Sequence, residues 1–253
     1  MAHRLTIWNR KTLSIVIAAI GLGAIVLLVT PLGRYAGWAW RRLAGGATVA
    51  QRLEQYGPAA RERLKPFFRA AGIEYPPAKL VLIGIKHSRQ LELWGGNPDS
   101  TFRHVRTYPV LAASGRLGPK LREGDRQVPE GLYRIESLHP SSMFHLALRV
   151  NYPNEDDRIR ARADGRSNLG GDIMIHGNDV SVGCLAMGDQ AAEDLFVLVA
   201  DVGLANTELI LAPVDFRTWL GDVPADAPAW TAQLYSEIRE RMSHFRDDVE
   251  GTR

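Results

Sequence analysis

The chain has 253 residues, of which 45% are hydrophobic and 23% charged, and its formal net charge is +3. This length and balance are typical of one large or two small globular domains and exclude a disordered chain. The arginines are scattered along the sequence, so it lacks the clustered basic stripe of a nucleic-acid-binding module, and we expect no nucleic-acid partner.

The N-terminal segment predicts a membrane anchor. Leu13 to Thr30 is an uncharged, mostly apolar run, and a membrane-spanning helix needs about 20 such residues. A buried soluble helix normally carries a polar stripe, and no Ala-x-Ala cleavage site of a signal peptide follows the run. We therefore expect residues 1–32 to be an uncleaved anchor. Charge does not choose its orientation, because basic residues lie on both sides: Arg4, Arg10 and Lys11, then Arg34, Arg41 and Arg42.

Residues 33–78 predict a helical connector. The stretch from Arg41 to Ala71 is rich in Ala, Arg, Leu and Glu. Proline removes a helical hydrogen bond, so we expect one or two helices broken at Gly57-Pro58 and at Pro66. Tyr75-Pro76-Pro77 ends the connector, because the residue before a proline is biased away from helical geometry.

Residues 79–215 predict a mostly β domain with helices, arranged as a sandwich or barrel. Short apolar or alternating runs are separated by Gly, Pro and Asn, which is typical of strands and turns. The expected strands are Lys79 to Ile85, Gln90 to Trp94, Phe102 to Ala112, Leu132 to Leu138, Phe144 to Val150, Ile173 to His176 and Glu208 to Leu211.

Two helices and one long loop complete the expected elements. Gln190 to Val199 predicts a helix inside the domain. Trp230 to Val249 predicts an amphipathic helix in the C-terminal part, residues 216–253, with an apolar face of residues spaced by four. Asn154 to Asn168 is strongly polar and predicts a loop, and long loops are often binding elements.

The strongest functional signal surrounds Cys184, the only cysteine of the chain, with His176 eight positions before it. A strand ending at His176, a turn from Gly177 and a return to Cys184 bring imidazole and thiol together. Cysteine attacks as a thiolate, and an adjacent histidine takes its proton. Gly183 permits close backbone approach, so the amides from Val182 to Cys184 predict an oxyanion hole.

Other interpretations of these residues remain open. Cys184 can be a buried structural thiol, and His176 a solvated histidine at a strand end. Ser181 either assists the site or hydrogen-bonds its own backbone in a turn. No further cysteine and no paired histidine spacing supports a zinc site, so we expect neither a metal nor a cofactor.

Substrate-binding candidates lie outside this segment. His145 is the best second imidazole, although its strand pattern also suits a plain surface position. The arginines of the polar loop suit bidentate binding of substrate carboxylates, and the alternative is a solvated face; the candidates are Arg160, Arg162 and Arg166. Arg149 and Asp172 flank expected strands, and we expect them to pair.

Two stretches, Gly118 to Tyr133 (GPKLREGDRQVPEGLY) and Gly170 to Gly177 (GGDIMIHG), resemble conserved runs of the L,D-transpeptidase (YkuD-like) family of cell-wall enzymes. The resemblance implies that Cys184 is the nucleophile, that His176 is the base, and that a main-chain carbonyl near Gly177 orients the imidazole. It also implies a mostly β domain with a catalytic cleft at one end.

The sequence departs from the common pattern of the family. Only seven residues separate His176 from Cys184, fewer than usual. Val182 stands where most members have a second histidine, and Val128 stands where threonine is usual. The first two departures are shared with a YafK-like subgroup. Members of that subgroup include enzymes that hydrolyse a bond to diaminopimelate and detach a lipoprotein from peptidoglycan.

The resemblance therefore implies a bacterial inner-membrane protein with one membrane pass and its catalytic domain in the periplasm. Its expected reaction is cysteine acyl transfer on peptidoglycan stem peptides that contain diaminopimelate. Hydrolysis of the same bond, with a wall-linked lipoprotein as a further partner, is the first alternative. An inactive envelope protein that binds peptidoglycan is the second.

Overall fold

The computed structural model describes residues 46–98, 101–219 and 222–246. Residues from Ala47 onward belong to one compact unit. The expected anchor, residues 1–32, lies outside the described residues and stays a prediction. Within the described ranges, each helix is too short or too polar to cross a bilayer.

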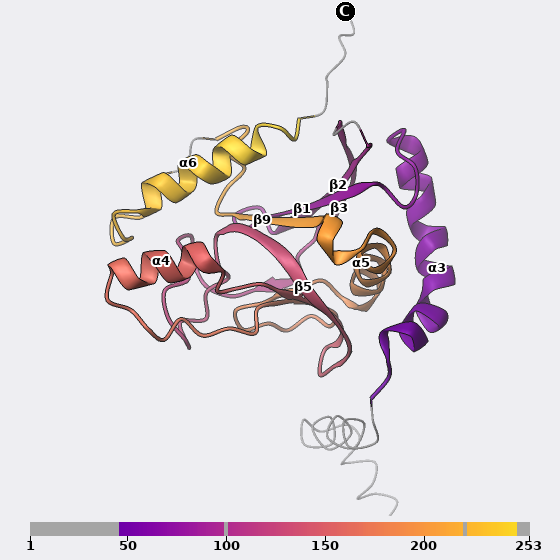
Figure 1. Ribbon diagram of the computed structural model, residues 1–253, viewed down its shortest axis with the longest axis horizontal. Helices are drawn as coiled ribbons and strands as arrows, with labels where there is room; N and C mark the ends of the chain where they lie inside the picture. The colour runs from indigo at the N-terminus through magenta and orange to yellow at the C-terminus, as the bar shows by residue number, and fades with distance from the viewer. Residues whose placement is uncertain (1–45, 99–100, 220–221, 247–253) are drawn as a thin grey trace, which may run out of the picture. The chain divides into compact units, whose positions relative to one another are not determined.

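A mixed sheet dominates the described part of the chain (Figure 1). Its order is β3-β2-β1-β9-β5-β6-β7-β8-β4, with parallel pairing between β1 and β9 and between β7 and β8. The strands are β1 (Lys79–Ile85), β2 (Gln90–Gly96), β3 (Phe102–Pro109), β4 (Ala112–Ala113), β5 (Gly131–Ser142), β6 (His145–Val150), β7 (Met174–His176), β8 (Leu185–Ala186) and β9 (Thr207–Ala212). A mixed sheet with helices agrees with the predicted mostly β domain that also contains helices.

Strand β5 joins the two halves of the sheet. Its first residues, Gly131 to Arg134, pair with β9, and the rest of the strand pairs with β6 from Ile135 onward. The register shifts between Ile135 and Ser137, and such irregularities bend a strand and increase its twist. The two halves therefore share one long strand, and the half that contains β6, β7, β8 and β4 carries the cysteine motif.

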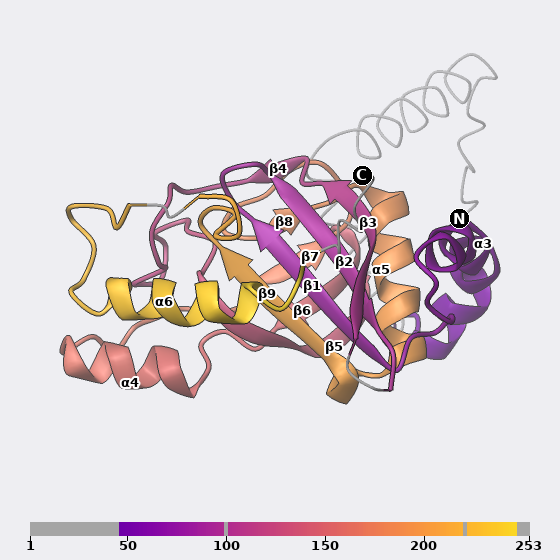
Figure 2. The same ribbon diagram turned by 90° about the horizontal axis from the view of Figure 1, so that it is seen from above.

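Helices cover both faces of the sheet (Figures 1 and 2). Helices α3 (Val49–Ala70) and α5 (Asp189–Val202) lie side by side, whereas α4 (Glu155–Ala163) lies beside α6 (Thr231–Met242). A short 3-10 helix, Leu204–Asn206, precedes β9. Strand β1 is buried on both faces: Leu80 and Leu82 enter the core cluster that includes α3 and α5, and Val81 and Ile83 enter the cluster with α6. This explains the nearly continuous apolar run of β1.

The prediction that prolines break the connector was wrong, because α3 continues through Pro58 and Pro66. Interior proline costs a helix about 3 kcal/mol. Packing offsets that cost: the buried Gly57, Ala60, Leu64 and Phe68 recur every three or four residues along one face. A capping box between Thr48 and Gln51 also closes the N-terminal end of the helix.

The prediction of a loop from Asn154 to Asn168 was also wrong, because the segment contains α4. Asn154 caps the Asp157 amide, and the Asp157 carboxylate accepts the Asn154 amide in return. Such a reciprocal pair satisfies two helix N–H groups that otherwise lack partners. The spacing of Asn154 and Asp157 was the sequence signal for this helix.

The expected strand from Phe102 to Ala112 is divided in two. Strand β3 ends at Pro109, and the chain then crosses to the other half of the sheet, where β4 pairs with β8. The Val110 amide donates to Arg89 O, and the Leu111 amide donates to Ala186 O, so hydrogen bonds lead the chain across. This crossing places Ala113 opposite Leu185, next to the cysteine motif.

Helix α6 is shorter than expected from Trp230 to Val249. It ends at Met242, where Ser243 caps it and donates its amide to carbonyls of the last turn. Residues 247–249 lie outside the described residues. The predicted apolar face is present, since Leu234, Ile238 and Met242 are buried in the second core cluster.

Candidate active site

The parallel pair of β7 and β8 brings His176 and Cys184 together. His176 ends β7, and Cys184 directly precedes β8. The register pairs Ile175 with Leu185 and His176 with Ala186. Continued by one residue, that register sets Cys184 beside Met174. Cys184 therefore lies directly before the strand that pairs with the one ending at His176.

The imidazole of His176 is buried, oriented and covered. His176 as a whole is only 1% exposed. Nδ1 lies 2.6 Å from Gly177 O and donates to it, as expected, which leaves Nε2 as the proton acceptor. The ring stacks on Phe144 with centroids 4.7 Å apart. Burial lowers the pKa of His176, so the ring is neutral near pH 7 and suited to act as a base.

The thiol of Cys184 is partly exposed and makes contact with β7 rather than with the imidazole. Sγ lies 3.6 Å from Asp172 O. Burial raises the pKa of Cys184, and the charge of Asp172 adds to this, while the Met174 amide and Lys120 oppose it. Among the hydrogen bonds of the described residues, none joins Sγ to His176. The free protein therefore holds a neutral thiol beside a neutral imidazole.

These environments predict the pH dependence of thiol alkylation. We expect Cys184 to react slowly with iodoacetamide at neutral pH and to reach half its maximal rate above the usual thiol pKa of about 8.5, because only the thiolate reacts. Intact mass measured from about pH 6 to about pH 10 reports the rate, and the single cysteine makes the adduct unambiguous.

We expect His176→Gln to leave this alkylation profile nearly unchanged, because no hydrogen bond joins the imidazole to Sγ in the free protein. Fast alkylation near pH 7 that is lost in His176→Gln would contradict both expectations. That result would indicate a preformed thiolate–imidazolium pair.

In residues 177–184, which we call the nucleophile loop, two backbone amides donate hydrogen bonds to serine hydroxyls. The Gly183 amide donates to Ser114 Oγ at 2.6 Å, and the Cys184 amide donates to Ser181 Oγ at 3.1 Å. Ser181 Oγ also donates to Cys184 O at 2.6 Å, so Ser181 serves the backbone of the turn. Gly183 has φ +81°, a conformation that favours glycine. Two of the amides predicted to form an oxyanion hole, those of Gly183 and Cys184, therefore donate to serine hydroxyls in the free protein.

Ser114 was not among the residues predicted from the sequence. It follows β4 and reaches the nucleophile loop across 69 positions of sequence. Ser114 Oγ also donates to Arg126 O, so one hydroxyl links the loop before β5 to the turn before β8. Its place directly before Gly115 is an ordinary turn pattern and carried no distinguishing signal.

A family model for the L,D-transpeptidase catalytic domain, YkuD, matches residues 79–214, which is more than half of the chain. The chain belongs to this L,D-transpeptidase family. The match begins at the first residue of β1 and ends two residues after β9, so it includes every strand of the described sheet. The resemblance noted in the sequence is therefore confirmed.

The chain is similar to curated proteins named "Putative L,D-transpeptidase YafK" from Escherichia coli strain K12 and from Escherichia coli O157:H7. Each is 36% identical over 116 residues, which are 45% of this chain and 44% of that protein. The chain thus spans less than half the length of the curated relatives it matches.

Two solved structures are more distant. The helical cell shape determining protein Pgp2 from Campylobacter jejuni has a TM-score of 0.45 and 19% identity, covering 67% of this chain and 71% of that one. Bd1075 of Bdellovibrio bacteriovorus has a TM-score of 0.40 and 19% identity, covering 65% and 54%. Such low scores carry no argument about the site.

Val182, where most L,D-transpeptidases have a second histidine, lies at the surface. It is 71% exposed, and Val180 is 53% exposed. Two exposed valines in the turn that leads to Cys184 form an apolar rim beside the thiol. Val182 therefore adds apolar surface at a position where most members of the family have an ionisable histidine.

The arginines predicted to bind substrate have carboxylate partners elsewhere. Arg160 pairs with Glu237 of α6, Arg162 with Glu155, and Arg166 with Asp164. None of these contacts involves His176 or Cys184. The structure therefore favours the alternative interpretation, in which these arginines are surface groups around α4. Arg149 and Asp172 pair at 3.1 Å, as expected.

The imidazole of His145, the predicted second imidazole, contacts α5 and α3. Its Nε2 lies 3.1 Å from Glu193 Oε1 on α5, and its ring meets the edge of Tyr56 from α3. Its backbone, with φ 72°, nevertheless lies close to the site: a Cβ built on Gly177 would lie 2.9 Å from His145 Cβ. His145 therefore packs against Gly177, the residue after His176.

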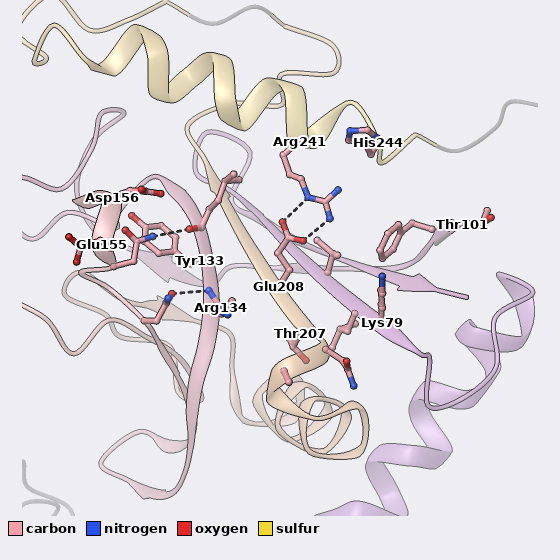
Figure 3. Close-up of a pocket in the computed structure, with 18 of the residues that line it drawn as sticks. Lys79, Thr101, Tyr133, Arg134, Glu155, Asp156, Thr207, Glu208, Arg241 and His244 are labelled. Carbon is pink, nitrogen blue, oxygen red and sulfur yellow. Dashed lines mark hydrogen bonds and ion pairs between the residues drawn. The ribbon is translucent and has the colours of Figure 1, made fainter. Parts of the chain in front are cut away.

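A large groove lies away from this pair. It has a volume of about 920 Å³ and is lined by the starts of β1 and β9, by the first turn of α4 and by the end of α6 (Figure 3). Glu208 and Arg241 form a bidentate ion pair inside it. Its lining includes neither His176 nor Cys184, so this groove is separate from the candidate pair.

Proposed function

We propose that this chain is a peptidoglycan-modifying cysteine acyltransferase that acts on stem peptides containing diaminopimelate. The observation that supports it is the parallel pairing of β7 and β8. Cys184 directly precedes β8, His176 ends the neighbouring β7, and its Nδ1 is held by Gly177 O. Membership of the L,D-transpeptidase family supports the substrate class.

The first half of the proposed reaction forms a thioester. His176 Nε2 takes the thiol proton as Sγ attacks the amide carbonyl on the L-centre of diaminopimelate. The tetrahedral intermediate then collapses, and His176 returns the proton to the departing amine. Burial disfavours both the imidazolium form of His176 and the thiolate form of Cys184 in the free protein. The proton is therefore transferred as Sγ attacks, and not before.

Stabilisation of the oxyanion requires an exchange of hydrogen bonds. The amides of Gly183 and Cys184 donate to hydroxyls in the free protein, and a developing negative charge is a stronger acceptor than a hydroxyl. Substrate therefore displaces Ser114 Oγ and Ser181 Oγ from these amides as the intermediate forms.

The second half resolves the thioester. Attack by an amine of another stem peptide completes transfer, whereas attack by water completes hydrolysis. Hydrolysis, including release of a wall-linked lipoprotein, is the second candidate, because the chain has the short spacing from His176 to Cys184 and the Val182 that resemble the YafK-like subgroup. An inactive protein that binds peptidoglycan is the third candidate.

Incubation of the purified chain with muropeptides tests these candidates. We expect a covalent adduct on Cys184 in the intact mass and cross-linked products, and Cys184→Ala should reduce turnover at least about 1,000-fold. Shortened peptides without cross-links would favour hydrolysis. Turnover that is unchanged in Cys184→Ala would exclude the mechanism, and binding without any product would favour the inactive candidate.

We also propose that residues 1–32 anchor the protein in the bacterial inner membrane with the catalytic domain in the periplasm. The apolar run from Leu13 to Thr30 supports this arrangement. A reporter that is active only in the periplasm, fused after Arg253, should be active, and a reporter active only in the cytoplasm should be silent. The reverse result would exclude the proposed location.

A further inference from the structure

The turn between β5 and β6 packs directly on the general base. Phe144 stacks on the His176 ring at 4.7 Å with an angle of 27° between the planes. The backbone of the same turn crowds the next residue, because a Cβ built on Gly177 would lie 2.9 Å from Phe144 O. This hairpin therefore contacts both the ring of His176 and the peptide whose carbonyl orients it.

The first turns of α3 hold that hairpin from outside. Arg52 Nε donates to Pro140 O at 2.8 Å, and the Ala47 amide donates to Ser141 Oγ at 2.9 Å. The ring of Tyr56 meets the His145 ring edge-on, with centroids 5.1 Å apart. Two contacts from α3 and one from Ala47, which lies just before the helix, thus reach a single hairpin.

Ion pairs join α3 to α5. Arg61 makes two hydrogen bonds to Asp201, and Arg63 bonds to Asp194, which is fully buried on α5. Glu193 accepts from Arg63 and also meets His145, so it connects α3 to the hairpin through α5. Bidentate arginine–carboxylate contacts fix geometry as well as charge.

We propose that Phe144 is a positioning residue for His176, and that the first turns of α3 set its place by holding the β5–β6 hairpin. The stacked ring blocks rotation of the imidazole, which keeps Nδ1–H on Gly177 O and Nε2 free for the thiol proton. The role in turnover rests on the proposed function, whereas the orientation of the ring does not.

Histidine-selective ¹⁵N NMR of the full chain tests the orientation without substrate, with the His176 signal assigned by its loss in His176→Gln. We expect neutral His176 to be the Nδ1–H tautomer. Phe144→Leu should give a tautomer mixture and lower the kcat for thioester formation about tenfold with KM unchanged. Arg52→Ala should change the tautomer ratio and the kcat in the same direction by a smaller amount. Phe144→Tyr should keep the tautomer and the kcat of the wild type.

Matched controls separate positioning from general stability. Met143→Leu changes an exposed neighbour of Phe144, and Gln55→Ala removes a partner of Arg52 that does not touch the hairpin. Both should keep the wild-type tautomer. Arg52→Ala removes the contacts of a half-buried side chain with Pro140 O, Gln55 and the Tyr56 ring. No core side chain is lost, so it remains informative where Phe144→Leu does not fold.

Lower melting temperatures with an unchanged His176 tautomer in Phe144→Leu and Arg52→Ala would overturn the proposal and leave these residues a structural role only. A tautomer shift in a chain that never forms a thioester would support the positioning role and count against the proposed function instead.

Discussion

Replacing Gly177 with alanine will destabilise the protein and remove most of the activity that depends on His176. A Cβ at this position would lie 2.6 Å from Asp189 Oδ1, 2.9 Å from His145 Cβ and 2.9 Å from Phe144 O. Two of these atoms belong to backbone or to a Cβ, so a rotamer change cannot relieve the overlap. Overpacking of this kind costs about 1–3 kcal/mol.

The loss of activity is expected to exceed the loss of stability. Gly177 O orients the imidazole, and its peptide has to move to admit the methyl group. A displacement of about 1 Å at a catalytic group can reduce the rate about 100-fold. Urea unfolding measures the stability of Gly177→Ala, and the rate of adduct formation on Cys184 measures the activity.

Gly171→Ala is the matched control, since its nearest atom, Tyr152 O, is 3.9 Å from the added Cβ. We expect that variant to stay within about 0.5 kcal/mol of the wild type and to keep its activity. Equal behaviour of the two alanine variants would show that crowding at Gly177 does not position His176.

Removing the buried charge of Lys86 should destabilise the fold by about 3–5 kcal/mol, because Glu130 then remains as an unpaired buried carboxylate. Lys86 Nζ lies 2.8 Å from Glu130 Oε1, and the two side chains are 9% and 0% exposed. Nζ also donates to Gly118 O and Val128 O. Burial lowers the pKa of Lys86, and the charge of Glu130 opposes that effect.

This ion pair also supports the nucleophile loop. Glu130 accepts from the Gly118 amide and from Tyr235 OH of α6, so it holds the loop that leads from Ser114 to β5. Ser114 in turn receives the Gly183 amide. We therefore expect Lys86→Met to change the alkylation rate of Cys184 as well as the unfolding midpoint in urea.

Two comparisons test this account of Lys86. Arg162→Met breaks an exposed pair with Glu155, and exposed pairs contribute at most about 1 kcal/mol. The double variant Lys86→Met with Glu130→Gln should be more stable than Lys86→Met alone, because no charge remains buried without a partner. A double variant less stable than the single one would contradict this explanation.

Regular elements with strong periodicity were predicted well from the sequence. Strand β1 was identified with its observed bounds, because burial on both faces requires the continuous apolar run that the sequence displays. Helix α5 was predicted from Gln190 to Val199, and the structure extends it to Asp189 at the start and to Val202 at the end. Burial on a sheet or helix face imposes a local pattern, and local patterns are visible in sequence.

The errors arose where tertiary contacts or capping outweighed local propensity. Helix α3 continues through Pro58 and Pro66 because its buried face and its ion pairs to α5 stabilise the helical form. Helix α4 forms in a segment without an apolar face, where its capping box and the Arg160–Glu237 pair with α6 stabilise it.

The sequence was enough to identify the family and to predict His176 and Cys184 as a pair, because both residues occur in one short motif. The tertiary structure alone decided what surrounds that pair. Ser114 reaches Gly183 across 69 positions, and α3 reaches the hairpin that carries Phe144 across 88 positions at Arg52 and Pro140. Such contacts depend on how distant segments fold together, and no local periodicity records them.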